Sequence, residues 1–450
     1  MSGFPDAAIA AALALLFAAA GNAILGRRPA GIGEWNESFL VGAGAASAAL
    51  VPLSIFLGHR ALLAALAVVL AAAGASVLLP RKAQREHRPQ VPRPRDPWTP
   101  VFFALAAAAV LLFTALDLRV AYRWDGLAIW AARAQLLHHD GSLFGTIPPP
   151  GSYLRSKLRY PPLLPLAEAL VATIRGKWDF DALKPIFPLF FLSLLIGTAR
   201  AARTFGSGAA ALGAAALVGL LPAVSTGTNL GGYADLPEAA VVAAAAAACL
   251  RESPATLSWR SPAPWLLGAL LMVKREGIIP LAVLAMVLLA AGLARPAIRP
   301  RRAWSALAPP ALFLAIRAAH LLRLKIPGPK RFPLFSQPAA AVAERIGLVA
   351  ANAARWLLAP ELWGVLWPAT FAAAAILVVR GGGKERALAA IALLCVGADA
   401  APFLVTAWPI PLHVEQAYSR LLEQVSPLAV IVLIAARERA KEWASGGAPG

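Results

Sequence analysis

Apolar segments about as long as a bilayer is thick recur along most of this sequence. A transmembrane helix needs about 20 consecutive apolar residues, and runs close to that length occupy, among others, residues 6–25, 39–58, 61–79, 99–116 and 206–225. Of the 450 residues, 59% are hydrophobic and only 14% are charged, whereas a soluble domain carries about 25% charged residues. The sequence therefore predicts an all-α, polytopic helical membrane protein.

Basic residues between these runs set the expected orientation, because the cytoplasmic loops of membrane proteins are enriched in Lys and Arg. The segment 81–97, RKAQREHRPQVPRPRDP, is rich in arginine and proline and is predicted to be cytoplasmic. Counting spans back from it places the N-terminus outside and Arg27 and Arg28 inside. No basic stretch precedes the run at 6–25, so we expect an uncleaved first span rather than a signal peptide.

The net charge of +19 follows the same bias, so we expect no nucleic-acid partner. About thirteen spans with a cytoplasmic C-terminus are predicted for the whole chain. We divide it into a three-span region with its basic loop, 1–98, and a main region, 99–450. After the runs given above, further spans are predicted near residues 185–200, 233–250, 261–275, 277–294, 303–321, 361–379, 386–407 and 422–436.

Two long segments, 119–183 and 322–360, are expected on the outer face. Within the first, YPPLLPLAEALVATI (160–174) is helical in pattern but short, and two prolines stand near its start. We expect a helix lying along the outer surface, and a second one near 340–358. Reading 160–174 as a span instead would place the basic segment RPAIRPRR (295–302) outside, against the charge bias.

Thiol labelling tests this topology. In intact cells, Asp140→Cys should react with a membrane-impermeant thiol reagent, and Gln90→Cys should not. The two native cysteines, Cys249 and Cys395, lie in apolar runs and should add little background; they provide neither a disulfide framework nor a metal cluster. The opposite labelling pattern would overturn the orientation.

The stretch AYRWDGLAIWAARAQ (121–135) is a polar island between apolar regions, and it falls on the expected outer side. It places Asp125 beside Trp124, with Trp130 and two arginines close by. An acid between aromatic residues favours a ligand site. The alternative is that both tryptophans anchor the chain at the membrane interface.

Two further polar segments are expected at the same face. In NLGGYADLPEAAV (229–241), Asp235 begins a predicted span, where an acid also favours the helix start. In MVKREGIIP (272–280), Lys274 and Arg275 form a turn on the side that is usually poor in cations. A solvated turn is the alternative, but clustered cations there favour an anionic ligand such as a lipid phosphate.

A fourth polar segment, LHVEQAYSRLLEQVSP (412–427), precedes the last span. Read as a helix, it places His413, Gln416 and Arg420 on one face, which is either a solvated face or part of a phosphate site. The sequence contains no nucleotide-binding Walker loop, no HExxH and no GxSxG motif, so nucleotide hydrolysis and protease chemistry lack support.

The order of these motifs resembles a known family. WDG (124–126), RYPPLLPL (159–166), GYADLPEA (232–239), KREG (274–277) and the late LHVEQAYSRLLEQVSP look like the motifs of bacterial GT-C membrane glycosyltransferases, which are similar to the dolichyl-phosphate-mannose protein mannosyltransferases. The resemblance covers residues 99–436. Two features depart from it: Arg275 stands where the family usually has Asn, and the first three spans precede the matched part.

The resemblance implies a GT-C fold and inverting transfer of a sugar from a polyprenyl-phosphate donor, at the outer face of a bacterial inner membrane. The acceptor would be an envelope glycan, a lipid or a protein. Asp125 would accept the proton of the acceptor hydroxyl, directly or through a bound metal, and Asp235 would orient the acceptor or assist Asp125. Divalent metal use varies across such enzymes, so the resemblance leaves the cofactor open.

The remaining residues receive binding roles from the same resemblance. Lys274, Arg275 and Arg420 would hold the donor phosphate as it becomes the leaving group. The expected contacts with the substrate come from Trp124, Trp130, Tyr233, Glu276 and His413. Two other functions stay open: a transporter or flippase of lipid-linked saccharides, which usually has inverted repeats and polar residues through the bilayer, and a membrane protein without activity.

Overall fold

The computed structural model describes residues 3–78, 96–227, 229–252, 257–293, 300–327, 333–334 and 337–445. The secondary-structure elements that these residues form are all helices, which confirms the predicted all-α class. The basic segment 81–97 lies outside the described residues except for its last two. Lys330 and Arg331 of the second outer segment also lie outside them.

Seven helices of the described part are long and apolar enough to cross a bilayer: Pro5–Leu25, Ile32–Val77, Trp98–Asp117, Phe180–Ala202, Ser305–Leu324, Gly383–Leu404 and Ile410–Ala444. A bent pair, Gly208–Leu220 with Pro222–Gly231, would add an eighth, and three shorter apolar helices accompany them. A multi-pass helical membrane protein is therefore confirmed, and the count of about thirteen spans stays a prediction.

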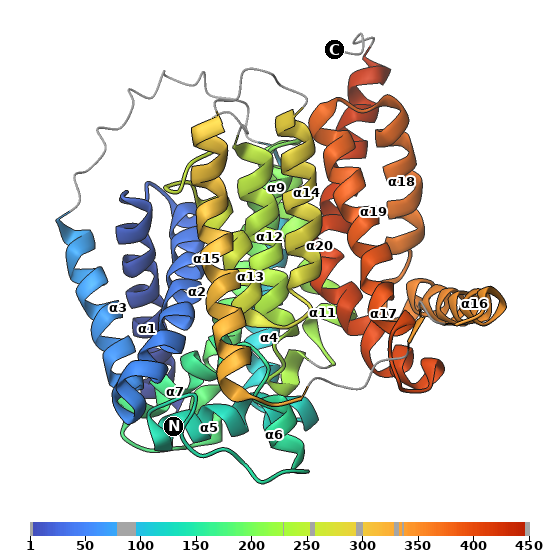
Figure 1. The fold of residues 1–450 in the computed structure, drawn as a ribbon. Helices are drawn as coiled ribbons and strands as arrows, with labels where there is room; N and C mark the ends of the chain where they lie inside the picture. The colour runs from blue at the N-terminus through green and yellow to red at the C-terminus, as the bar shows by residue number, and fades with distance from the viewer. Residues whose placement is uncertain are drawn as a thin grey trace.

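The first three helices pack side by side as a group: α1 (Gly3–Leu25), α2 (Ile32–Leu57) and α3 (Ala61–Val77) (Figure 1). A short 3-10 turn, η1 (Gly58–Arg60), joins the last two. The backbones of α1 and α2 lie so close together that a Cβ atom on Gly42 would be 1.8 Å from the backbone oxygen of Phe17. Small residues in these apolar runs thus allow close helix contact.

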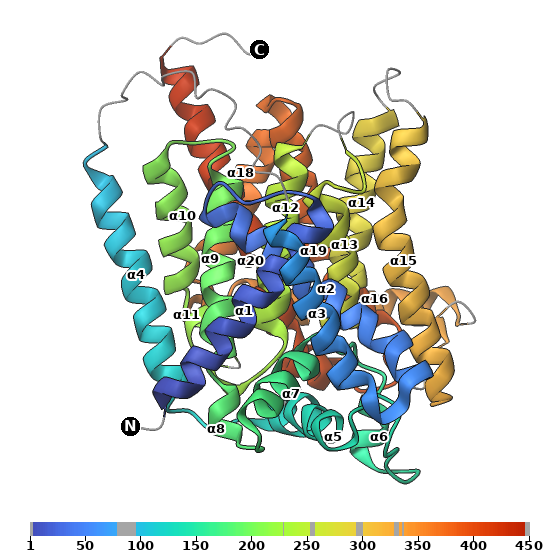
Figure 2. The same ribbon diagram turned by 90° about the vertical axis from the view of Figure 1, so that its left-hand side faces the viewer.

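The centre of the bundle is built around α12 (Asp235–Arg251), which packs against α9 (Ile186–Ala202), α13 (Pro262–Val273) and α20 (Ile410–Ala444). Its alanine-rich sequence is buried from Asp235 to Leu250. Helices α4 (Trp98–Asp117) and α10 (Gly208–Leu220) pack against α9 at one side (Figure 2). Alanine fits this position because small side chains let several helices surround one.

The last part of the chain supplies α14 (Ile278–Leu293), α15 (Pro300–Leu324), α18 (Leu366–Arg380) and α19 (Gly383–Leu404) before α20. Helix α20 is continuous over 35 residues. The predicted polar segment 412–427 and the predicted span 422–436 are therefore one helix, and Arg420 lies within it.

The predicted outer segment 119–183 forms a layer of short helices at one end of the bundle, close to the start of α1 (Figure 2). This layer contains η2 (Gly126–Ala131), α5 (Ala132–Asp140), α6 (Tyr153–Lys157), α7 (Leu163–Arg175) and α8 (Phe180–Leu183). We call this end the α5–α8 end; α20 finishes at the opposite end (Figure 1).

The two predicted surface helices both exist, but they differ in burial. Helix α7 is buried from Leu163 to Ala172, packed among α1, α2 and α5, because its apolar residues cover most of its circumference. Helix α16 (Ala339–Leu357) lies at the side of the bundle and runs crosswise to the long helices (Figure 1). Only Val349 and Ala353 of α16 are buried, as expected of an amphipathic helix at a membrane surface.

Candidate functional site

The site begins where two glycine-containing motifs touch. The backbone N–H of Arg123 donates to the carbonyl oxygen of Gly231 at 3.0 Å, in the short turn η3 (Asn229–Gly231). A Cβ atom on Gly126 would lie 1.9 Å from that same oxygen, so only glycine permits this approach. The WDG segment is thereby held against the chain that leads into α12, and Asp125 lies beside its first turn.

Asp235, the first residue of α12, is fully buried and its carboxylate accepts four hydrogen bonds. Lys274 Nζ and Gln424 Nε2 donate to Oδ1 at 2.7 and 2.6 Å. The guanidinium of Arg420 donates to Oδ2 through Nε at 3.0 Å and Nη2 at 2.7 Å. Three segments that are distant in the sequence therefore meet on this carboxylate: the start of α12, the turn between α13 and α14, and α20.

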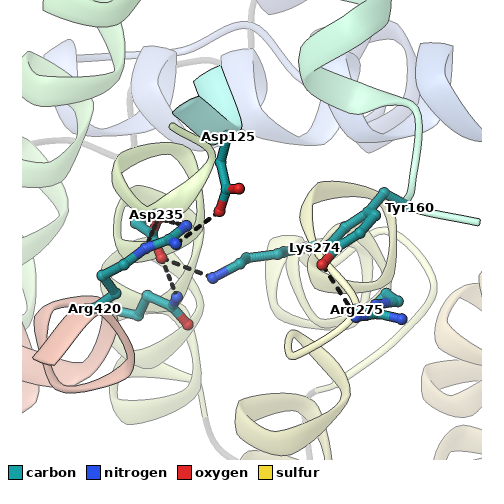
Figure 3. Close-up of polar contacts among 7 residues, drawn as sticks. Asp125, Tyr160, Asp235, Lys274, Arg275 and Arg420 are labelled. Carbon is teal, nitrogen blue, oxygen red and sulfur yellow. Dashed lines mark hydrogen bonds and ion pairs between the residues drawn. The ribbon is translucent and has the colours of Figure 1, made fainter. Parts of the chain in front are cut away.

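Arg420 links the two acids that the sequence singled out. Its Nη1 donates to Asp125 Oδ2 at 2.8 Å while its other nitrogens hold Asp235, and Figure 3 shows the guanidinium lying between the two carboxylates. The plane of Arg420 also lies over the ring of Tyr233, 4.5 Å from the centroid. We call Asp125, Asp235, Lys274, Arg420 and Gln424 the polar network.

Charge balance explains how these groups coexist in a buried place. The network pairs two carboxylates with two cations, and each ion pair is 2.7 or 2.8 Å long. Removing an ion from water costs several kcal/mol even after relaxation, so these charges are tolerable only because each one has partners. The Asp125 side chain is the most exposed of the network's ion-paired groups, at 26%, and only its Oδ2 is held by Arg420.

The predicted phosphate ligands are arranged in two places rather than one. Lys274 and Arg420 belong to the polar network and are ion-paired. Arg275 turns away from it (Figure 3) and donates to the hydroxyl of Tyr160 at 3.0 Å, with its guanidinium 4.3 Å from the centroid of that ring. A phosphate beside Lys274 and Arg420 would therefore share them with Asp235 and Asp125.

The aromatic candidates separate by exposure. Trp124 is 79% exposed and Trp130 only 1% exposed. The ring of Trp130 packs edge-on against Tyr160, with centroids 5.2 Å apart. Burial argues against Trp130 as a platform for a sugar, while Trp124 presents a free face suited either to a ligand or to the membrane interface.

Two other predicted residues lie away from the network's hydrogen bonds. Glu276 lies in the α13–α14 turn, and its Oε2 is buried without a hydrogen-bond partner in the described part of the chain. His413 contacts aromatic rings, with centroids 4.9 Å from Phe403 and 5.4 Å from Trp408. The geometry gives neither residue a contact with Asp125.

Two contributors were not predicted as site residues. Gln424 completes the coordination of Asp235, and it stands four residues after Arg420, one turn further along the same face of a helix. Tyr160 holds Arg275 and packs on Trp130. The helical spacing was a usable signal for Gln424, whereas the pairing of Tyr160 with Arg275 depends on a contact across 115 positions.

The helix α6 brings two more polar side chains toward Asp125. Burial, and then the negative charge of Asp125, raise the pKa of Tyr153 to about 12. Partial burial lowers the pKa of Lys157, and Asp125 counters this effect. The amine of Lys157 lies 4.4 Å from the centroid of the Tyr153 ring. These two residues form the border of the site nearest to Asp125.

In the part of the chain that the structure describes, no three His, Cys, Asp or Glu side chains are grouped closely enough to hold a metal ion. Both Cys249 and Cys395 are free and buried. Of the two acids in the polar network, Asp235 already accepts four hydrogen bonds, which leaves the Asp125 carboxylate as the candidate ligand for a cation.

Comparisons with protein-family models, with curated proteins and with solved structures each return no match for this chain.

Proposed function

We propose that this protein is a membrane glycosyltransferase that moves a sugar from a polyprenyl-phosphate donor to an acceptor on the outer face of the membrane. One observation carries the proposal: the four sequence-distant motifs converge on the polar network at a single end of the bundle. That end has an acid, Asp125, which Arg420 holds through Oδ2 alone, close to the buried Lys274 and the partly buried Arg420. An acid and an anion site in one place are what such a transfer requires.

The chemistry assigns a step to each group. The acceptor hydroxyl gives its proton to Asp125 Oδ1 as its oxygen forms a bond to the anomeric carbon of the donor. The bond from that carbon to the phosphate oxygen breaks, and the electron pair leaves with the polyprenyl phosphate. Lys274 and Arg420 offset the charge that develops on this leaving group, and Arg275 extends the cationic surface. Attack from the opposite face inverts the anomeric carbon.

The proposed membrane arrangement follows from the order of the helices. We propose that α1, α2, α3, α4, α9, α10, α12, α13, α14, α15, α18, α19 and α20 cross a bacterial inner membrane. The α5–α8 end then faces the periplasm or the exterior, as the charge bias predicts. A GT-C arrangement and the mannosyltransferase-like motifs belong to the same proposal.

A transporter of lipid-linked saccharides is the second candidate, and buried carboxylates favour it. Glu238, Asp399 and Glu423 lie in α12, α19 and α20, each with an oxygen that has no hydrogen-bond partner in the described residues. Intramembrane acids often belong to transport pathways. Glu238 and Glu423 stand within one turn of Asp235 and Arg420, so they extend the polar network rather than cross the bilayer.

One assay separates the two candidates. Purified protein is given a polyprenyl-phosphate sugar with a labelled sugar, together with a crude envelope fraction as acceptor. A transferase should place the label on the acceptor and release one polyprenyl phosphate for each sugar moved. Movement of intact donor across the bilayer of a proteoliposome, with no released polyprenyl phosphate, would instead assign transport.

A further inference from the structure

A second group of cations lies under the outer segment, apart from the polar network. Arg133 of α5 is 4% exposed, and Arg317 and His320 of α15 are 7% and 1% exposed. The connection between α5 and α6 covers His320: the ring of Phe144 contacts it with centroids 5.8 Å apart. Figure 1 shows the lower end of α15 beside α5 and α6. We call Arg133, Arg317 and His320 the α5–α15 cluster.

The hydrogen bonds inside the cluster fix where its protons lie. Arg133 Nη1 donates to the carbonyl oxygen of Pro161 at 3.1 Å. Arg317 donates to the carbonyl oxygen of Arg159 and to His320 Nδ1. Because a guanidinium has no acceptor, Nδ1 must be the bare nitrogen and the proton must sit on Nε2. That Nε2–H is buried and has no partner in the described residues.

These cations have no ion-paired acid among the described residues, which sets them apart from other buried and partly buried cations. Lys184 has Asp117 at 3.8 Å, Arg175 has Asp6 at 3.1 Å, and Lys274 has Asp235. Within the part of the chain that the structure describes, no Asp or Glu forms an ion pair with Arg133 or Arg317.

The electrostatics of this arrangement are unfavourable for the protein alone. A buried charge without a counter-charge is strongly destabilising, and the arginines also repel each other. Burial, and then the charge of Arg317, lower the pKa of Arg133 to about 9. Two guanidinium groups and the unpartnered Nε2–H of His320 supply only donors, so a ligand that is rich in acceptors and carries negative charge complements the cluster.

We propose that the α5–α15 cluster is a phosphate-binding site, separate from the polar network and from the transfer reaction. A phosphate group fits because its several oxygens can accept from two arginines and a histidine at once. Arg317 stands seven residues before the end of α15, about 10 Å along the helix axis. That places it near the level of lipid headgroups. The phosphate belongs either to an anionic lipid or to a small soluble phosphate.

Thermal unfolding of the purified full-length protein tests this site without any sugar donor. One arm titrates inorganic phosphate into a phosphate-free buffer. The other arm compares detergent micelles that contain phosphatidylglycerol with micelles that contain diacylglycerol, which lacks the phosphate. Bound ligand raises the melting temperature. A rise in the first arm identifies a soluble phosphate, and a rise only in the second identifies a lipid phosphate; both support the site.

The variants decide whether the rise comes from this cluster. Arg317→Gln should bind the effective phosphate at least about tenfold more weakly, because one charged hydrogen-bond donor is lost. It should be no less stable than the wild type without phosphate, since an uncompensated charge is removed. Arg323→Gln, exposed on the same helix, is the matched control and should bind like the wild type.

Three results would overturn the proposal. The first is no rise in either arm, and the second is an equal rise in Arg317→Gln. The third concerns folding and uses a second variant, Arg133→Gln. If Arg133→Gln and Arg317→Gln both fail to fold without phosphate, the two arginines serve only to stabilise the protein's own structure.

Discussion

Replacing Asp235 by asparagine should lower the free energy of unfolding by about 3–5 kcal/mol, the usual cost of removing one partner from a buried ion pair. The substitution keeps the size of the side chain but removes the counter-charge that Lys274 and Arg420 share. The buried Lys274 then loses its ion pair, and Arg420 keeps only its pair with Asp125. Asparagine also offers one acceptor oxygen in place of two, and four donors now converge on Asp235.

Thermal unfolding of the purified protein in detergent, followed by tryptophan fluorescence, measures this loss. Asp179→Asn is the matched control, because Asp179 also pairs with an arginine, at 2.5 Å, but is more exposed. Exposed pairs of that kind contribute about 0–1 kcal/mol. The double variant Asp235→Asn with Lys274→Met should recover part of the stability by removing an orphaned charge. Equal melting temperatures for Asp235→Asn and Asp179→Asn would contradict the buried network.

Replacing Asp125 by asparagine should reduce the rate of sugar transfer by a factor of about 10²–10⁴, the contribution of a positioned general base. An amide cannot take the proton of the acceptor hydroxyl, although it can still accept a hydrogen bond from Arg420. The loss should fall on kcat, since in the proposed mechanism Asp125 acts in the transition state rather than in donor binding.

Stability separates this effect from misfolding. Asp125 lies at the border of the network, and its side chain is partly exposed, unlike that of Asp235. Asp125→Asn should therefore unfold within a few degrees of the wild type while losing transfer. Asp179→Asn, in the same outer segment, should keep the wild-type rate. An Asp125→Asn protein that is folded and fully active would remove Asp125 from the mechanism.

The helices of this protein follow from its sequence more directly than its contacts do. Apolar runs such as 206–225 and 386–407 predicted helices because a bilayer allows little else. The ends of the helices are less predictable: no local signal shows that the polar segment 412–427 and the span 422–436 form one unbroken helix, α20. Helix α7 was expected at the surface, and its burial depends on how α1 and α2 pack above it.

The sequence predicted most residues of the polar network, but it did not predict which of them form ion pairs with each other. Asp125, Asp235, Lys274 and Arg420 stand out because polar residues beside a membrane are costly. The sequence predicted that Lys274 and Arg420 bind a phosphate while Asp125 acts separately as a base. In the structure these cations form ion pairs with Asp125 and Asp235. Such pairing depends on side-chain reach across up to 295 positions. The sequence did not predict the α5–α15 cluster, because Arg317 and His320 lie within an ordinary apolar span.

One comparison tests most directly the proposal that this protein transfers a sugar with Asp125 as the base. It measures single-turnover transfer of labelled sugar from a polyprenyl-phosphate donor to an envelope acceptor. The wild-type protein and Asp125→Asn are compared at equal concentrations of folded protein. We predict a labelled acceptor and an equal amount of released polyprenyl phosphate with the wild type, and a loss of at least about a hundredfold in rate with the variant. No transfer by the wild type with any envelope acceptor, or equal transfer by both proteins, would contradict the proposed enzyme.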